Sequence, residues 1–323
     1  MRLLVLGGTG FVGRVLVEEA LARGDRVTVL NRGRRPPLPG VTALAGDRTA
    51  PDGLAALDGH LWDAVVDTWS AAPGAVRDAA RALRGRAGHF TYVSSRSVYV
   101  YGAPAPLTED TPLVDAGGDD YASVKRGGEL GAAEFGDAVL LARAGLILGP
   151  HEDVGRLPWW LGRLARGGPT VAPGPRDLPL QYIDVRDLAG FLLDAAGRGL
   201  AGAYNVVGPS GHTTMGELLD TANAVTGGRA ELRWTSPEAL RAAGVEEWTD
   251  LPIWLPPGPD HDYLHRGDVS RAVAAGLSVR PVADTVAGTW AWLRSLPAPP
   301  AARADRPAVG LGPEIEARIL AAG

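Results

Sequence analysis

A tyrosine and a lysine four residues apart form the strongest chemical motif of this 323-residue chain, Tyr121-Ala122-Ser123-Val124-Lys125. Residues i and i+4 share one face of a helix, so the phenol and the ammonium would point into the same pocket. A neighbouring cation stabilises a phenolate and lowers the pKa of tyrosine from about 10, which suits it to acid–base work. Lys125 is also the only lysine among 32 basic residues, which argues against an ordinary surface pair.

Two serines end an apolar run upstream of this motif, within the segment 92–99. Ser94 and Ser95 precede Tyr121 by 27 and 26 residues. A serine hydroxyl there could donate to the same substrate oxygen that Tyr121 protonates. The two motifs together predict a site that moves a proton at an oxygen atom.

A glycine-rich turn follows the first apolar run and opens a helical pattern. In this spacing Gly7 permits a tight turn, Gly10 lets a pyrophosphate come close, and Gly13 allows the helix to pack on the strand. The helix N-terminus then offers backbone N–H groups to the phosphates. The predicted dinucleotide-binding residues of this turn are Gly7, Thr9, Gly10, Phe11, Val12 and Gly13.

The end of the second apolar run predicts which dinucleotide binds. An acidic residue at this point holds the ribose 2′-hydroxyl of NAD, whereas an arginine accommodates the 2′-phosphate of NADP. This chain has Asn31 and Arg32, with Arg34 and Arg35 close behind. We therefore expect NADP as the cofactor and leave NAD open.

Short apolar runs alternate with helical patterns through the first half of the chain. Strands are expected at 2–6, 26–30, 41–45, 62–67, 89–94 and 138–148, and helices at 11–22, 76–83 and 121–135. Wholly apolar strands that alternate with helices indicate a parallel sheet covered on both faces. The expected fold is α/β, a Rossmann doubly wound parallel sheet with a smaller C-terminal substrate lobe.

The composition of the chain changes after residue 150, because seven of the nine tryptophans lie in this part. We expect an NAD(P)-binding Rossmann domain over 1–150 and a C-terminal substrate-binding lobe over 151–296, interleaved with it. Residues 297–323 read as a Pro/Ala-rich tail with a short helix at 314–320. Trp159, just after Arg156, could line a substrate pocket, although packing of a small lobe explains these tryptophans equally well.

Composition excludes several classes of protein. Hydrophobic residues make up 46% of the chain and charged residues 21%, which supports a packed core. Cysteine is absent, so disulfides, a thiol nucleophile and a thiolate metal site are excluded. A formal charge of −5 argues against a nucleic-acid partner, and no apolar run is long enough for a transmembrane helix. We expect a cytoplasmic protein with a small-molecule substrate and no membrane association, and leave a homodimer open.

One histidine pair has the spacing of half a metal site. His261 and His265 are four residues apart, but the glutamate of a catalytic HExxH motif is missing and no third ligand is suggested nearby. A solvated helix start explains the pair better, and we expect no metal.

These motifs in combination resemble an extended short-chain dehydrogenase/reductase, and more narrowly the NAD-dependent epimerase/dehydratase family. The likeness covers about residues 1–295 and rests on several segments of the chain. These are Gly7–Gly13, the Gly46-Asp47-Arg48 turn, Tyr92–Tyr99, the Tyr121–Lys125 motif and Ile183–Asp187. The resemblance implies a Rossmann fold that binds NAD(P).

The resemblance also implies a role for each catalytic residue. Ser95 rather than Ser94 takes the position of the catalytic serine. Tyr121 would be the acid–base, while Lys125 would bind the nicotinamide ribose and tune Tyr121.

Further cofactor contacts follow from the same resemblance. Asp47 takes the position that contacts adenine, with Arg48 in the same turn. Thr68 lies in the strand-end segment beside the cofactor.

Two departures from the family pattern bear on the reaction. Sugar-nucleotide dehydratases resemble one another in an Asp-Glu pair where this chain has Arg96 and Ser97, so dehydration of that kind is disfavoured. The asparagine that many NDP-sugar enzymes carry is missing from the segment 143–150, which weakens a sugar-nucleotide substrate. We hypothesise that Arg96 recognises an anionic or strongly polar substrate group, the alternative being an arginine turned to solvent.

The sequence as a whole predicts an NADP(H)-preferring oxidoreductase. It would transfer hydride reversibly at a secondary alcohol or ketone of a polar, polyol- or sugar-like metabolite. One alternative is an NAD(P)-dependent epimerase acting on a sugar or sugar nucleotide with retained cofactor. Another is a non-enzymatic dinucleotide-sensing protein, although such proteins typically lose the tyrosine and lysine. An RNA-binding relative is disfavoured by the negative charge.

Overall fold

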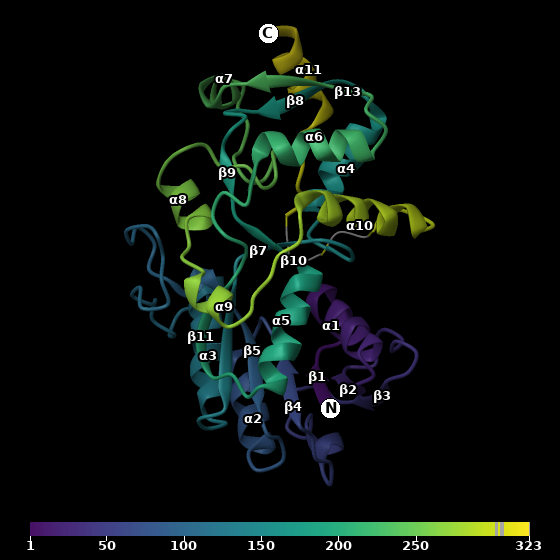
Figure 1. Ribbon diagram of the computed structural model, residues 1–323, viewed down its shortest axis with the longest axis vertical. Coiled ribbons are helices and arrows are strands. Elements are labelled where there is room, and N and C mark those ends of the chain that lie inside the picture. Colours follow the sequence, from purple (N-terminus) through teal and green to yellow (C-terminus); the bar gives the residue numbers. More distant parts are fainter. Residues whose placement is uncertain (301–302, 304–306, 323) are drawn as a thin grey trace. The chain divides into compact units, whose positions relative to one another are not determined.

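The computed structural model of this protein describes residues 1–300, 303 and 307–322. They form two compact units, each built from several stretches of chain (Figure 1). Unit 1 consists of Met1–Gly145, Val185–Val207 and Asp268–Ser278, and unit 2 of Leu146–Asp184, Gly208–Gly267 and Val279–Gly323. Unit 1 first ends at Gly145, and two later segments of the chain return to it.

A sheet of seven parallel strands forms the centre of unit 1. The order across the sheet is β11-β6-β5-β4-β1-β2-β3, and Figure 1 labels each of these strands except β6. The strands are β1 Arg2–Leu6, β2 Arg26–Asn31, β3 Thr42–Ala45, β4 Ala64–Asp67, β5 Phe90–Ser95, β6 Val139–Ala144 and β11 Gly202–Val206. The strand order reverses between β1 and β4, which is where doubly wound sheets bind their ligands. The predicted Rossmann fold is confirmed.

Helices cover both faces of this sheet. They are α1 Phe11–Ala22, α2 Pro73–Leu83, α3 Tyr121–Ala133, α5 Val185–Gly197 and the short α9 Ser270–Ala274, with 3-10 turns η1 Ala55–Leu57 and η2 Arg96–Val98. Leu30 of β2 is buried in the cluster that α2 and α3 cover. Its neighbour Val29 lies beside Val17 of α1 at Gly8. Because successive strand residues face opposite sides, α1 covers the other face, where it packs against α5.

One predicted strand is wrong in its extent. The run 138–148 is not continuous but forms β6 and then β7, with Gly145 between them. A Cβ at Gly145 would lie 2.5 Å from Val207, so the chain passes there without room for a side chain. After Gly145 the residues of β7 pair with β10 in unit 2 rather than with the large sheet.

Unit 2 contains three two-stranded sheets and six helices in the part that the structure describes. Its strands are β7 Leu146–Leu148, β8 Gly168–Pro173, β9 Pro179–Leu180, β10 Tyr182–Asp184, β12 Thr213–Thr214 and β13 Ala230–Thr235. Its helices are α4 Arg156–Arg166, α6 Met215–Val225, α7 Pro237–Ala242, α8 Pro259–His265, α10 Val282–Ser295 and α11 Pro313–Ala322. Trp160 and Trp254 are fully buried in its core, so packing accounts for these two tryptophans.

The end of the chain packs into unit 2. Helix α11 lies against β8, and its Glu316 carboxylate accepts hydrogen bonds from Arg163 at 2.9 and 2.8 Å. Residues 301–302, 304–306 and 323 of the predicted tail lie outside the described residues. Of the helices described, none combines the length and the apolar character needed to cross a membrane.

Candidate active site

The glycine turn between β1 and α1 is shaped by close approaches. Gly7 has a φ of +119°, and a Cβ there would lie 2.5 Å from Thr68 Oγ1. A Cβ on Gly13 would lie 3.1 Å from the backbone nitrogen of Gly8. Gly10 is the N-cap of α1, has no side-chain cap, and has open space where a Cβ would stand. The first N–H groups of α1 therefore have no capping side chain, as binding of a pyrophosphate requires.

The loop after β2 turns back toward the glycine turn. Asn31 Oδ1 accepts a hydrogen bond from the backbone N–H of Gly33 at 2.8 Å, which turns the chain at the strand end. Arg35 Nη1 donates to the carbonyl oxygen of Thr9 at 3.1 Å. A guanidinium thus lies directly on the glycine turn.

Positive charge gathers beside the neighbouring strand end. Hydrogen bonds from Thr49 lower the pKa of Asp47, and the charges of Arg32 and Arg34 lower it further. Asp47 is therefore ionised at neutral pH and lies within electrostatic reach of both arginines. The predicted role of Asp47 as an adenine contact stays a prediction.

Arg48 points inward rather than along this surface. Its guanidinium donates to both carboxylate oxygens of Asp67, at 2.8 and 2.6 Å, and to the carbonyl oxygen of Ala75 at 2.7 Å. It also lies 5.2 Å from the centre of the Trp69 ring. The predicted role of Arg48 as a cofactor contact stays a prediction, and the structure adds a buried ion pair at the end of β4.

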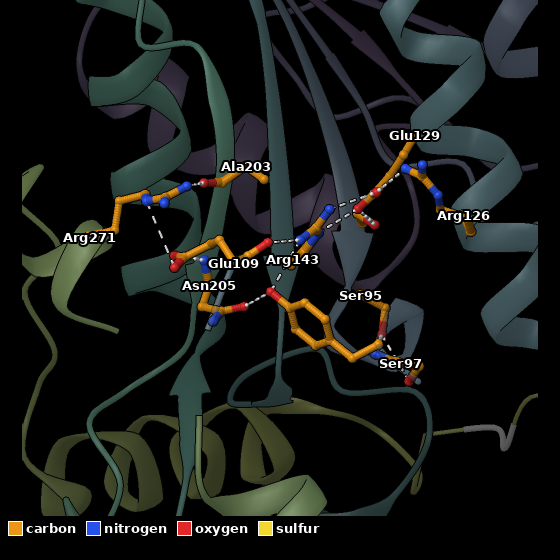
Figure 2. A network of polar contacts seen from close by, with 11 residues as sticks. Ser95, Ser97, Glu109, Arg126, Glu129, Arg143, Ala203, Asn205 and Arg271 are labelled. Atoms are coloured by element: carbon orange, nitrogen blue, oxygen red, sulfur yellow. Dashed lines mark hydrogen bonds and ion pairs between the residues drawn. The ribbon is translucent and has the colours of Figure 1, made fainter. Parts of the chain in front are cut away.

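The two serines of β5 have different partners. Ser94 is buried, and its Oγ donates to Glu129 Oε1 at 2.8 Å. Ser95 ends the strand, and its Oγ lies 3.1 Å from both Ser97 Oγ and the backbone nitrogen of Ser97 (Figure 2). The Ser97 N–H donates to Ser95, and the Ser95 hydroxyl donates to Ser97 Oγ. Ser94 is thus committed to a buried carboxylate, which favours Ser95 as the serine that meets a substrate.

Helix α3 begins at the predicted acid–base residue. Its N-cap is Asp120, whose carboxylate accepts hydrogen bonds from the backbone N–H groups of Ala122 at 2.9 Å and Ser123 at 3.1 Å. Tyr121 occupies the first helical position and is 40% exposed, whereas Lys125 one turn later is 3% exposed. The helix therefore presents a phenol at the surface of unit 1 above a buried ammonium.

The Lys125 ammonium is held by backbone carbonyls. Its Nζ donates to the carbonyl oxygens of Trp69 at 3.0 Å and Val93 at 2.7 Å, and lies 4.9 Å from the centre of the Tyr92 ring. An ammonium has three N–H donors, and among the described residues two of them have acceptors, which leaves one for a ligand. Burial lowers the pKa of Lys125 to about 8, although the carboxylates of Asp67 and Glu129 act in the opposite direction.

The sequence analysis did not predict a buried ion pair that lies between α3 and β6. Arg143 of β6 donates from Nε and Nη2 to the two carboxylate oxygens of Glu129, at 2.9 and 3.1 Å (Figure 2). Both side chains are buried. A signal for Glu129 was present, because an acid four residues after Lys125 lies on the same helix face. Nothing local to Arg143 indicated its partner.

Of the three predicted substrate residues, one lies in unit 1 and two lie in unit 2. Arg96 of unit 1 is only 5% exposed, so the alternative of an arginine turned to solvent is wrong. Arg156 and Trp159 belong to α4 of unit 2. The Arg156 guanidinium lies 5.0 Å from the centre of the Trp248 ring, and Gly310 passes so close to the Trp159 ring that a Cβ would overlap it.

The histidine pair has structural contacts. His261 Nε2 lies 2.8 Å from the carbonyl oxygen of Pro179, and His265 Nδ1 accepts a hydrogen bond from the Gln181 N–H at 2.9 Å. Both rings are buried, so the expected solvated helix start is wrong. Among the described residues no three His, Asp or Glu side chains are grouped to hold a metal ion.

Known proteins resemble the chain over most of its length. An epimerase family protein of Bos taurus is 28% identical over 251 residues, which is 70% of this chain and 81% of that protein. The 2′-dehydrokanamycin reductase of Streptomyces kanamyceticus is 34% identical over 183 residues, 53% of this chain and 51% of that protein.

Solved structures share the fold. The Bordetella bronchiseptica enzyme WbmG, in complex with NAD and UDP, matches with a TM-score of 0.69 at 22% identity, over 91% of this chain and 95% of that one. The UDP-glucose 4-epimerase of Thermotoga maritima, with UDP-glucose, matches with a TM-score of 0.67 at 17% identity, over 91% and 99% of the two chains.

A family model matches the region that contains the glycine turn, Ser95 and the Tyr121–Lys125 pair. It matches residues 3–208 and describes the NAD dependent epimerase/dehydratase family. The protein belongs to this family, and it is an NAD(P)-dependent enzyme of the extended short-chain dehydrogenase/reductase type.

Proposed function

We propose that this protein is an NADP(H)-preferring oxidoreductase that interconverts a secondary alcohol and a ketone on a polar, polyol- or sugar-like metabolite. The observation that carries the proposal is the first turn of α3, where an exposed Tyr121 stands one turn before the buried Lys125 ammonium. This arrangement suits a proton transfer at a substrate oxygen, with a fixed positive charge to stabilise the tyrosinate.

The dinucleotide fits the residues present. The uncapped amides of α1 and the open space at Gly10 would hold the pyrophosphate, and Gly7 permits the turn. When bound, the nicotinamide supplies or accepts the hydride. The third N–H of Lys125 is directed to the nicotinamide ribose in this proposal, while its other two stay on Trp69 and Val93.

The chain's own residues would handle the proton. Tyr121 donates a proton to the substrate oxygen during reduction and removes it during oxidation. Ser95 donates a hydrogen bond to the same oxygen once a substrate replaces Ser97 Oγ as its acceptor. The Ser97 N–H continues to donate to Ser95 Oγ, which keeps the serine proton directed outward.

The preference for NADP rests on the residues after β2. Arg32 follows the strand where NAD sites carry an acid, and Arg34 and Arg35 lie in the same loop. The contact from Arg35 to Thr9 supports the proposal, because it holds this basic loop against the pyrophosphate turn.

The polar substrate is proposed from Arg96. Arg96 directly follows Ser95 in the chain, and a guanidinium at this point could donate charge-assisted hydrogen bonds to an anionic or hydroxyl-rich substrate. In Arg96→Ala we expect KM to rise and the affinity for NADPH to stay unchanged. Loss of NADPH affinity would show that Arg96 serves the cofactor instead. Arg156 and Trp159 are proposed as further substrate contacts.

The decisive experiment is Tyr121→Phe, which removes one oxygen atom. General acid–base catalysis contributes roughly 10²–10⁴-fold, so kcat should fall by that amount while NADPH affinity and thermal stability stay unchanged. Tyr101→Phe is the matched control, because Tyr101 is also exposed, at 61%. Full turnover of Tyr121→Phe on a substrate of the natural enzyme would overturn the proposal.

A further inference from the structure

The buried ion pair between Glu129 and Arg143 lies next to the strand end that carries Ser95. Glu129 stands one turn after Lys125 on α3 and is 1% exposed. Its two oxygens accept hydrogen bonds from Arg143, Ser94 and Arg126, the last at 3.1 Å. A carboxylate so deeply buried is stable only when it is paired and hydrogen-bonded in this way.

Two consecutive residues of β5 are attached to α3 through these contacts. The carbonyl oxygen of Val93 accepts from Lys125 at 2.7 Å, and the hydroxyl of Ser94 donates to Glu129 at 2.8 Å. The next residue along the strand is Ser95. Helix and strand are thus joined at two points, one turn apart on the helix, immediately before the serine.

Arg143 fixes Glu129 from the other side. Besides the fork to Glu129, its Nη1 donates to Tyr99 Oη at 3.3 Å and to the carbonyl oxygen of Glu109 at 3.1 Å. Tyr99 donates in turn to Asn205 Oδ1 at 2.6 Å, so the chain of contacts reaches β11 (Figure 2). These contacts join separate segments of unit 1 and hold the Glu129 carboxylate in place.

We propose that Glu129, held by Arg143, is a positioning residue that sets the end of β5 against α3 and so places Ser95 relative to Tyr121 and Lys125. This inference rests on the proposed function, since it takes those three residues as the catalytic set. Misplacement of a catalytic group by about 1 Å costs on the order of a hundredfold in rate, so a fixed β5–α3 contact matters.

The same carboxylate acts on the charge of Lys125. The groups around the ammonium are Asp67 with its partner Arg48, the ring of Tyr92, and Glu129 with its partner Arg143. Asp67 and Glu129 both favour the protonated amine, against its burial. Loss of the Glu129 charge alone should therefore lower the pKa of Lys125.

The test compares two buried pairs with matched substitutions. Glu129→Gln with Arg143→Met removes both buried charges together, which favours folding over a single loss. Arg126, which is partly exposed, loses its carboxylate partner in this variant. Glu316→Gln with Arg163→Met makes the same change in unit 2, where the pair is similarly buried. Both double variants should lose thermal stability. Only the first should lose kcat, by roughly tenfold to a hundredfold, with NADPH affinity within about threefold of the natural enzyme.

A second measurement does not depend on activity. Because Lys125 is the only lysine, protein labelled with ¹⁵N at the lysine side chain gives one amine signal whose titration can be followed by NMR. In Glu129→Gln the midpoint should fall by roughly half a pH unit or more, and it should stay unchanged in Glu316→Gln.

The outcomes separate the two proposals. Unchanged kcat and an unchanged Lys125 titration in folded Glu129 variants would overturn the positioning role. An equal loss of kcat in both double variants would overturn it too, since the effect would then be one of general stability. Full activity of Tyr121→Phe would instead overturn the proposed function, whatever the Glu129 variants show.

Discussion

Helices α1 and α3 carry the two halves of the proposed site on their first turns, and those turns are built in opposite ways. The N-cap of α1 is Gly10, which offers no side chain, so the first amides remain available to an anion. The N-cap of α3 is Asp120, whose carboxylate already accepts from two amides. In the proposed site, α1 would bind its ligand through free backbone N–H groups. In α3, Asp120 accepts hydrogen bonds from the first N–H groups, and the helix contributes the side chains of Tyr121 and Lys125 instead. The predictions below test this contrast.

The largest effect is expected at α3, from Lys125→Met. The variant would lose the proposed ribose contact and the charge proposed to stabilise the tyrosinate, so kcat should fall more than in Tyr121→Phe, by roughly 10³-fold or more. Lys125→Arg keeps the charge but presents a longer, planar group, and activity should still fall. Steady-state kinetics on purified variants is the measurement. Retained turnover in Lys125→Arg would show that charge alone is sufficient.

As pH rises through the pKa of Lys125, the activity of the natural enzyme should fall, whereas the contribution of Lys125 to stability should rise. The pKa of Lys125 in the folded protein is about 8, below its unfolded value, so the natural enzyme should lose activity as pH rises through about 8. The unfolded chain binds more protons between about 8 and 10.4, so the stability that this group contributes rises with pH there. Lys125→Met should therefore exceed the natural protein in stability below pH 8, and this difference should shrink above it.

The second prediction gives α1 the kind of cap that α3 has. A Cβ at Gly10 meets nothing within 4 Å, so Gly10→Asp fits, and its carboxylate should accept from the first amides of α1. Thermal stability should be kept or raised, while the affinity for NADPH falls by roughly ten- to a hundredfold, because one charge-assisted contact is worth about 1.5–3 kcal/mol. Fluorescence titration checks it, with Gly10→Ala as the control. Undiminished affinity would mean that the phosphates lie elsewhere.

The third prediction concerns the loop that Arg35 attaches to the α1 turn. Arg32→Asp should reverse the preference from NADPH to NADH, since it exchanges a 2′-phosphate partner for a 2′-hydroxyl partner. Each good contact to the phosphate is worth roughly ten- to a hundredfold in affinity. Arg26→Asp, at an exposed residue at the start of the same strand, is the control. Equal affinities for the two cofactors in the natural protein would contradict the NADP preference.

The smallest effect is expected when the cap of α3 is removed. Asp120→Ala should lower the free energy of unfolding by about 1 kcal/mol, the usual cost of a lost N-cap. If the cap only orders the first turn, kcat should fall less than tenfold, because Lys125 and Glu129 still hold the helix. Thermal denaturation and kinetics measure the two effects. A gain of anion binding at α3 would show that the two first turns are interchangeable.

The same contrast explains what the sequence could predict. The signals for α1 are local, and the helix has the predicted bounds because strand, glycines and apolar spacing lie within 22 residues. At α3 the Tyr121–Lys125 spacing is local too, but the partners of Lys125 come from Trp69 and Val93, far back in the chain. The Arg143–Glu129 pair and the split of β6 from β7 depend likewise on contacts between distant segments. Residue types and spacing alone do not specify such pairings.

The burial of Lys125 has a practical consequence for the outer surface of the molecule. Its ammonium is 3% exposed, so no lysine amine is presented to reagents in solution. Acylating dyes and amine-to-amine cross-linkers should therefore modify no lysine side chain of the folded protein. Copies of the chain that associate should therefore be linked through their carboxylates or guanidiniums. Acylation of Lys125 would instead report the moment at which unit 1 opens.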